Sequence, residues 1–447
     1  MKKYFQKIIF LSIPALLLTG KMIAQTKSLT LQEALQMASK GNRQLQIQLL
    51  ENKKAADAVK EAKSYLLPAV SGNATYNAYA ERPVIYLRNE TESPKVSDVR
   101  FGGRFAFDSY VAATYPILSP SVKSNVRIAG ISEQIQKRQT ENTEEHLALD
   151  IALTYLAVLV NKEQANLLMQ SLQRNERALK DSRSLFLQGK NLKTDTLSNY
   201  ISVQNLKAGI SALRNNTDVL LLQLKQLIGV EEHSHIELTD SLYITHGEME
   251  IKNPDQFILS SLQNRNDIKI QSLLIDQSRE QLQGTKALFK PQLSAIAQYQ
   301  VQNQADNMKL GNYNFPRTSF AGLKLSIPVY SGGRQKHKLS QSKSTVMQNE
   351  LALAEIENKV RTEIISLTAN LQEAYTQYRI QQQNVNAAEI NYNMMNDRYR
   401  YGMGSRLELT DAELALTRSK MDFVQSIYSI RLSELQLKKA MGILKLN

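Results

Sequence analysis

The sequence predicts a β-barrel joined to an α-helical barrel, assembled from several copies of an internally duplicated chain. Three observations support this fold class. A glycine-bounded turn between long helical segments occurs twice, once at Gly189 and again at Gly402. Columns of apolar residues at heptad spacing precede both turns. Two pairs of segments alternate apolar and polar residues with period two, which is typical of strands that have one apolar face.

Residues 1–24 are expected to be an export signal rather than part of the fold. A basic start (Lys2, Lys3 and Lys7) precedes an apolar core at residues 8–18, and the small residue Ala24 marks the expected cleavage site. The chain contains no cysteine, so we expect no disulfide, no thiolate metal site and no lipid anchor on a cysteine. Without the signal, the net charge of +13 falls to +9. Because Lys and Arg alternate with acids along the helices, no nucleic-acid partner is predicted.

In the first half, the elements follow the order helix, strand, strand, long helix, turn, helix. Short helices are predicted at residues 29–40 and 42–66, and Pro68 ends the second one. Alternation predicts strands at residues 69–80 and 105–115, joined by a polar loop over residues 81–100. A very long helix at residues 119–188 and a shorter one at residues 192–228 complete this half.

The second half repeats this order. A helix is predicted over residues 257–289, followed by strands at residues 293–301 and 321–329 and then by another long helix. Its heptad column is displaced from that of the first half by the same offset that separates the two turn glycines: Ile151, Val158, Ala165, Leu172, Leu179 and Phe186 correspond to Ile364, Leu371, Tyr378, Val385, Tyr392 and Tyr399. The predicted organisation is therefore a signal (residues 1–24), a first repeat (25–230), an equatorial linker (231–254) and a second repeat (255–447).

Both kinds of element predict association with further copies of the chain. The strand regions hold half of all Phe and Tyr residues, as expected for the aromatic girdles of a membrane barrel, yet four strands are too few to close one. On the last helix, one apolar column contains Leu407 and Leu414, and a second one about 200° away contains Leu409 and Leu416. Two such columns suit a helix with a neighbour on each side in a ring.

Several short motifs now support a family resemblance. They are the Tyr-Pro and Ile-Pro strand ends at residues 115–116 and 327–328, the Tyr-Ser-Gly-Gly-Arg helix start at residues 330–334, the Tyr-x-x-Gly-x-x-Ser turn at residues 399–405 and the terminal Met441-Gly442. At repeat spacing, this layout resembles the TolC family of outer-membrane efflux ducts over essentially all of the mature chain. The resemblance implies a homotrimer with a 12-stranded barrel in the outer-membrane lipid of a Gram-negative envelope and a 12-helix tunnel in the periplasm. It also implies a passive export duct for efflux or secretion, opened at its periplasmic tip by an adaptor (membrane fusion) protein and an inner-membrane pump.

The resemblance also implies roles for residues at the two helical turns. Glu408 and Asp411 match acids that ring the periplasmic constriction, and Tyr399 and Asp195 match partners that hydrogen-bond between helix pairs to close it. The family's further gate arginine would fall at Gly404 in this chain, so that contact is absent or moved to Arg406. A purely structural interpretation stays open, in which the two acids favour the helix dipole and Tyr399 packs at the end of its column.

Adaptor contacts are expected at the turn residues themselves, because a tip needs tight turns and small or apolar surface. The residues concerned are Gly189, Leu192, Gly402, Gly404 and Ser405.

No enzyme, cofactor or metal site is predicted. His233, His235 and His246 lie in the linker without a carboxylate shell, and no phosphate loop, zinc helix or Ser-His-Asp order is present. The alternative function is a soluble periplasmic coiled-coil scaffold. The alternating aromatic strands argue against it, since a scaffold has no use for an apolar face with period two.

Overall fold

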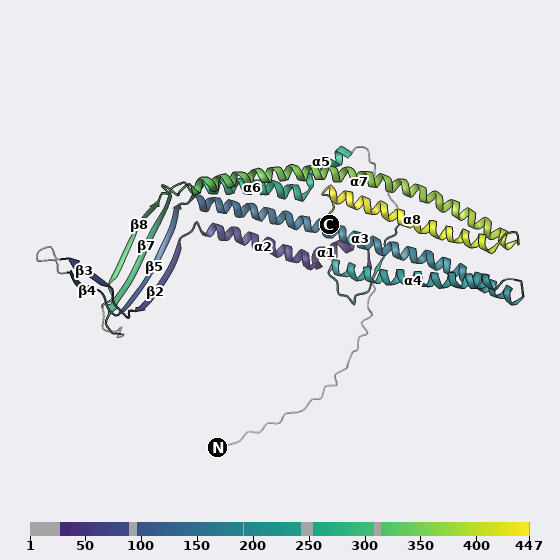
Figure 1. Cartoon of the computed structure of the whole chain (residues 1–447), viewed down its shortest axis with the longest axis horizontal. Helices are drawn as coiled ribbons and strands as arrows, with labels where there is room; N and C mark the ends of the chain where they lie inside the picture. Colours follow the sequence, from purple (N-terminus) through teal and green to yellow (C-terminus); the bar gives the residue numbers. More distant parts are fainter. Residues whose placement is uncertain (1–26, 89–95, 191, 243–253, 308–313, 447) are drawn as a thin grey trace, which may run out of the picture.

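In a computed structural model, the chain is a long rod of helices with a sheet at one end (Figure 1). The structure describes residues 27–88, 96–190, 192–242, 254–307 and 314–446. The predicted export signal of residues 1–24 therefore lies outside the described residues. None of the described helices combines the length and the apolar character that a membrane crossing requires.

The main sheet contains four antiparallel strands. They are β2 (Ala69–Ala78), β5 (Phe105–Leu118), β7 (Gln292–Ala305) and β8 (Arg317–Ser326), in the order β2-β5-β7-β8. Val111 lies opposite Gly72 and Tyr299, whereas its neighbour Tyr110 lies opposite Asn73 and Gln300. The register thus gives the sheet one apolar and one polar face, as the alternation predicts. Strands from the two halves of the chain lie side by side in it.

Further strands lie outside this sheet, so the prediction of four strands and of a loop over residues 81–100 was incomplete. Within that loop, β3 (Val84–Arg88) and β4 (Val96–Arg100) form a hairpin. It extends from the far end of the sheet (Figure 1). Arg82 fixes its base, donating to Asp306 Oδ1 and to the Gly102 carbonyl at 3.2 and 3.3 Å. A second pair, β1 (Lys27–Leu29) and β6 (Ile236–Leu238), is parallel and joins the start of the described chain to the linker.

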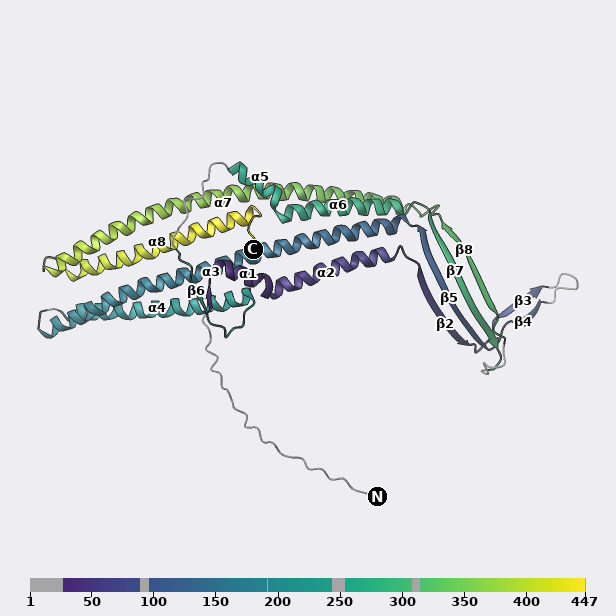
Figure 2. The ribbon, with the colours of Figure 1, turned by 180° about the vertical axis from the view of Figure 1, so that it is seen from behind.

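The helices form two long antiparallel hairpins, each extended by shorter helices. The elements are α1 (Leu31–Gly41), α2 (Arg43–Ser64), α3 (Pro120–Leu187), α4 (Lys193–Ile228), α5 (Pro254–Asn264), α6 (Asn266–Ala287), α7 (Arg334–Arg400) and α8 (Arg406–Ala440). In both views, α2 and α4 follow one another alongside α3, and α6 and α8 do so alongside α7 (Figures 1 and 2). With 68 residues, α3 is about 100 Å long.

The heptad columns of α3 and α7 form the hydrophobic core near the middle of the rod. Ile151, Val158, Ile364 and Leu371 have no exposed surface. Nearby, the hydroxyl of Tyr155 donates to the Leu29 carbonyl at 2.9 Å, which fixes β1 against α3. The columns become more exposed towards the turns.

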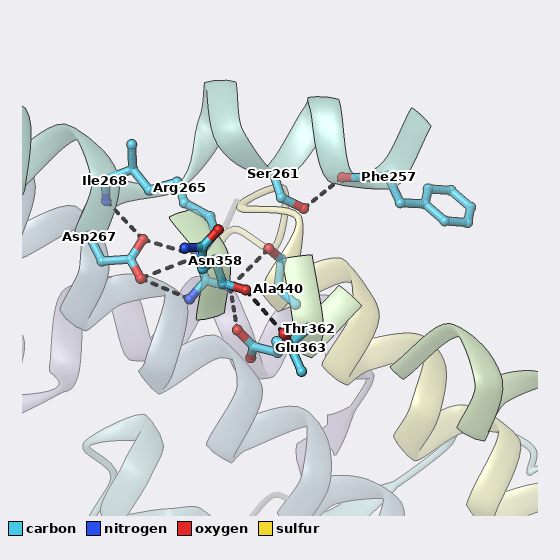
Figure 3. Close-up of polar contacts among 9 residues, drawn as sticks. All are labelled: Phe257, Ser261, Arg265, Asp267, Ile268, Asn358, Thr362, Glu363 and Ala440. Carbon is cyan, nitrogen blue, oxygen red and sulfur yellow. Dashed lines mark hydrogen bonds and ion pairs between the residues drawn. The ribbon is translucent and has the colours of Figure 1, made fainter. Parts of the chain in front are cut away.

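The single helix predicted over residues 257–289 is wrong, because the chain breaks at Arg265. This residue has non-helical backbone between α5 and α6, with φ of −59° and ψ of 132°. Its guanidinium bonds Asp267 (2.8 Å) and Glu363 (2.6 Å) and donates to the Ala440 carbonyl at the end of α8 (3.3 Å; Figure 3). No proline or glycine marks the break. Tertiary contacts at the end of α8 compensate for the lost helical hydrogen bonds.

The first half contains an equivalent joint at Asn42, between α1 and α2. The Asn42 amide donates to the Leu227 carbonyl at the end of α4 at 2.8 Å, and Leu227 occupies the position in the first repeat that Ala440 occupies in the second. Here Gly41 and Gly229 are in backbone contact. A Cβ on Gly229 would lie 2.1 Å from the Gly41 carbonyl oxygen, so the contact requires glycine.

Candidate functional site

The two helical turns predicted to be functional lie together at the end of the rod opposite the sheet (Figures 1 and 2). Both helices end in the same way. Gly189 and Gly402 adopt left-handed backbone with φ of 69° and 73°. The amides of Gly189 and Lys190 bond the carbonyls of Phe186 and Leu185, and Gly402 and Met403 repeat this with Tyr399 and Arg398. This is the Schellman pattern, in which glycine has no steric penalty.

The helices that follow the turns begin differently. Ser405 caps α8, because its hydroxyl accepts from the Glu408 amide at 3.2 Å and its own amide donates to the Glu408 carboxylate at 2.9 Å. This reciprocal pair is a capping box. At the start of α4, Leu192 occupies the cap position without a side-chain cap. The turn of the second half is therefore the more firmly fixed.

Glu408 and Asp411 are both exposed. Their spacing along the sequence places them on one side of α8. In the single chain, the Glu408 carboxylate serves the capping box, and an acidic ring would need further copies of α8. The ring stays a prediction.

Arg406 connects the two helical hairpins near their tips. It donates to Asn199 Oδ1 on α4 at 3.2 Å, and its guanidinium carbon lies 5.5 Å from the centre of the Tyr399 ring. Its Nε is buried and has no hydrogen-bond partner among the described residues. The structure therefore brings Arg406, Tyr399 and α4 together. Within the described chain, no hydrogen bond joins Tyr399 to Asp195, which lies one turn before Asn199.

The turns carry exposed apolar side chains, of which only Leu192 was among the expected contacts. Leu187, Leu192, Tyr401, Met403 and Leu407 are between 65% and 80% exposed. Gly404 has little free space, because a Cβ there would lie 3.3 Å from Arg398 Cβ and 3.4 Å from Glu408 Oε2. Ser405 serves as a helix cap besides lying at the tip.

A buried charge network between α3 and α8 was not predicted. Glu413 is buried, and its Oε1 accepts from Arg174 Nε at 3.0 Å and Asn175 Nδ2 at 2.9 Å. Arg174 also lies over the Tyr392 ring at 5.8 Å. Burial, followed by the negative charge of Glu413, raises the pKa of Tyr392. We call Arg174, Asn175, Tyr392 and Glu413 the inter-hairpin network.

The sequence did contain a signal for this network. Glu413 lies one helical turn after Leu409 and one before Leu416, so it shares the apolar face of α8. A charge on such a face requires a partner.

No group of three or more His, Asp or Glu residues in the described part of the chain could hold a metal ion. His233 and His235 belong to the described linker, and His246 lies outside the described residues.

Comparisons with known proteins give a consistent result. The sequence profile of the family described as "Outer membrane efflux protein" matches residues 258–443. The outer membrane efflux protein BepC of Brucella suis is 20% identical over 96% of this chain and 89% of its own length. The outer membrane protein TolC of Escherichia coli is 21% identical over 93% of this chain and 82% of its own length.

The fold is likewise similar to solved structures. The outer membrane protein VceC of Vibrio cholerae superposes with a TM-score of 0.73 at 16% identity, covering 92% of this chain and 96% of that protein.

Proposed function

We propose that this chain, which belongs to the TolC family of outer membrane efflux proteins, is the outer-membrane channel of a tripartite efflux or secretion system. The family is one of channels rather than enzymes. The observation that carries the proposal is the four-stranded sheet with one apolar face and two free edges, attached to rods of helix with an outward apolar column. Within the described part of one chain, the edge strands of the sheet have no further strand to pair with, and the outward apolar column has no helix to pack against.

The sheet supports a barrel shared between copies. β2 and β8 are its edges, and their outer hydrogen-bonding groups have no partner strand in the sheet. The apolar face exposes Val111, Tyr115, Tyr299, Leu323 and Leu325. In lipid, such a face is favourable but free strand edges are not, because every backbone polar group must be satisfied internally. Three copies joined edge to edge give twelve strands and close the barrel.

The helices support the same assembly. Of the two columns on α8, Leu409 and Leu416 are each 5% exposed, whereas Leu407 and Leu414 are 70% and 67% exposed. One column therefore packs within the chain, and the other faces outward. Exposed apolar residues also occur on α2 and α7, including Leu50, Leu351 and Ile390. A neighbouring copy would cover these surfaces and produce a 12-helix tunnel.

The other parts of the chain also have roles in the proposed channel. Residues 1–24 direct export, residues 25–230 and 255–447 are the two structural repeats, and residues 231–254 link them at the equator. The helical rods extend into the periplasm. Their tips, with Gly189, Leu192, Gly402, Gly404 and Ser405, contact a periplasmic adaptor protein, which connects the channel to an inner-membrane pump. The exposed apolar side chains at the tip suit such docking.

At the same tip, Tyr399, Asp195 and Arg406 hold the helix pairs closed, and Glu408 and Asp411 ring the constriction. Support comes from the contact of Arg406 with both Tyr399 and Asn199. Further from the tip, the inter-hairpin network joins α3 to α8 and adds a second polar contact between the two hairpins.

Fractionation and bilayer recordings test the function. We expect the protein in the outer-membrane fraction and soluble only with detergent, where it should form a stable trimer. In planar bilayers, replacing Tyr399 with Phe and Asp195 with Ala together should raise single-channel conductance. Recovery from the periplasm without detergent would support the scaffold function instead, and an unchanged conductance would remove these residues from the gate.

A further inference from the structure

The polar face of the main sheet has an unusual charge distribution. All residues of its four strands are described, and the register identifies those that share this face. Side-chain amides are frequent on it, most of all along β7: Asn73, Asn77, Gln292, Gln298, Gln300, Gln302 and Gln304. Only two residues on it are charged, Asp108 on β5 and Lys324 on β8. If three copies close a barrel, as proposed above, this face lines the lumen.

From this we infer that Asp108 and Lys324 determine the charge preference of the barrel lumen at two separate levels. The Asp108 carboxylates would favour cations near the end that carries the β3–β4 hairpin. The Lys324 ammonium groups would favour anions near the end that joins the helices.

The side chains that form hydrogen bonds with Asp108 are neutral, so none of them pairs with its charge. Gln300 Nε2 donates to both of its carboxylate oxygens, at 3.0 and 3.2 Å, and Gln298 Nε2 donates to Gln300 Oε1 at 3.3 Å. Beside it, Asn73 Nδ2 donates to the Tyr110 hydroxyl at 3.2 Å. These neutral groups orient the carboxylate without cancelling its charge. Within the described chain, neither Asp108 nor Lys324 forms an ion pair.

The two charges act at different depths. Asp108 lies opposite Gln302 on β7, and Lys324 lies opposite Ser294 on the same strand. The stretch of β7 between these levels is about 26 Å long. The Debye length is about 8 Å at physiological salt, so each level is screened from the other. In a trimer, each level would carry three like charges facing one lumen, an arrangement that sets ion preference in channels.

The absence of cysteine permits a direct measurement of the potential at each level. We would introduce single reporters, Gln302→Cys opposite Asp108 and Ser294→Cys opposite Lys324. Thr75→Cys, which also lies opposite Asp108, is a second reporter. Each would be modified in intact trimers with a cationic and with an anionic methanethiosulfonate reagent of similar size. The ratio of the cationic to the anionic rate reports the local potential.

We expect this ratio to be higher at position 302 than at position 294. Adding Asp108→Asn should lower the ratio of cationic to anionic rates about threefold at positions 302 and 75 and leave the ratio at position 294 unchanged. The threefold figure is the effect expected from one charge at a distance of about 6 Å in water at physiological salt. Adding Lys324→Gln should raise the ratio at position 294 and leave position 302 unchanged. Each charge variant thus has the other reporter as its control.

Failure of the inference can be separated from failure of the channel proposal. Val301→Cys, on the apolar face, should react slowly with both reagents. Reactive polar-face cysteines whose ratios do not respond to Asp108→Asn or Lys324→Gln would overturn the inference and leave the channel intact. Polar-face cysteines that react no faster than position 301 would show that this face does not line a water-filled lumen, and both proposals would be wrong.

Discussion

Between the two helical hairpins, Glu413 depends on two partners from α3, Arg174 and Asn175, because a carboxylate buried without partners is strongly unfavourable. The hydrogen bond from Thr417 to Ser171 at 3.3 Å extends the polar contact by one turn. Near the tip, the two hairpins are therefore joined by an ion pair and hydrogen bonds, each of which requires a particular donor and acceptor.

Glu413→Gln should destabilise the protein by about 2 kcal/mol, because it removes the buried negative charge that pairs with Arg174, whose side chain is only 29% exposed. Adding Arg174→Met should recover part of that loss, since no unpaired charge then remains. The matched control is Glu176→Gln, which removes the exposed pair with Lys207 (3.1 Å) and should cost less than about 1 kcal/mol. Denaturant unfolding in detergent measures these variants against the natural protein, and equal losses for Glu413→Gln and Glu176→Gln would contradict the network.

The capping role of Glu408 decides how an acidic ring should be tested. Alanine would remove both the charge and the cap, whereas Glu408→Gln keeps an acceptor for the Ser405 amide and removes only the charge. We expect Glu408→Gln with Asp411→Asn to weaken blockade of the channel by trivalent cations at least tenfold in bilayer recordings, with unchanged thermal stability. Blockade equal to that of the natural protein would refute the ring.

At the scale of elements, the turn glycines differ from glycines within helices. Gly402 has left-handed backbone, so Gly402→Ala should cost about 1 kcal/mol although its Cβ would meet nothing within 4 Å. Gly130 lies inside α3 and also has free space, so Gly130→Ala should stabilise the protein by up to about 1 kcal/mol. Thermal unfolding should show shifts of opposite sign. Shifts of the same sign would contradict the assigned turn.

The contact of α3 with α6 predicts a pH dependence of stability. Burial is the main cause that raises the pKa of Glu145 from 4.5 to about 7, opposed by the charge of Lys439 and the hydrogen bond from Asn266. The Asn266 amide donates to Glu145 Oε1 at 2.9 Å, while its buried Oδ1 has no partner among the described residues. A protonated Glu145 can supply a donor for that oxygen.

Because the folded pKa of Glu145 is raised, its contribution to stability is complete below about pH 4.5 and is lost as the pH rises through about 7. We therefore expect the folded protein to gain stability on acidification from pH 8 to pH 5. The gain is about 1 kcal/mol for this group after allowance for its partial exposure. Glu145→Gln should remove most of that slope in urea titrations at the two pH values. A slope that persists in the variant would assign the effect to other groups.

Sequence reasoning succeeded for elements whose signals are local and failed where tertiary contacts decide. Both long helices, the turns at Gly189 and Gly402 and the four strands of the main sheet follow from periodicity and glycine placement. The break at Arg265 was missed because it is stabilised by Glu363 and the Ala440 carbonyl, far away in the sequence. The β3–β4 hairpin was missed because the prolines and charges around it indicated a loop. The tip residues were placed by family resemblance, but the pairing of Glu413 with Arg174 required the structure.

At the scale of the whole molecule, assembly should depend on the outward column of α8. Leu414→Glu places a charge on that column while leaving the buried Leu416 in place, so the helices should form but the trimer should not. Leu414→Met is the control, because it keeps an apolar side chain of similar volume. Native mass measurements in detergent, with circular dichroism to confirm helix content, distinguish the two variants. A trimer that survives Leu414→Glu would show that this column is not part of the interface.

The glycine contact between Gly41 and Gly229 also has a mechanical consequence. It holds one end of α4, while the tip turn lies at the other end, 36 residues and about 54 Å away. If α4 tilts as a rigid helix about this joint, a tilt of about 5° would move its other end, at the tip, by about 5 Å. We therefore expect substitutions at this joint, such as Asn42→Ala, which removes the hydrogen bond to the Leu227 carbonyl, to change the position of the tip although Asn42 lies far from it.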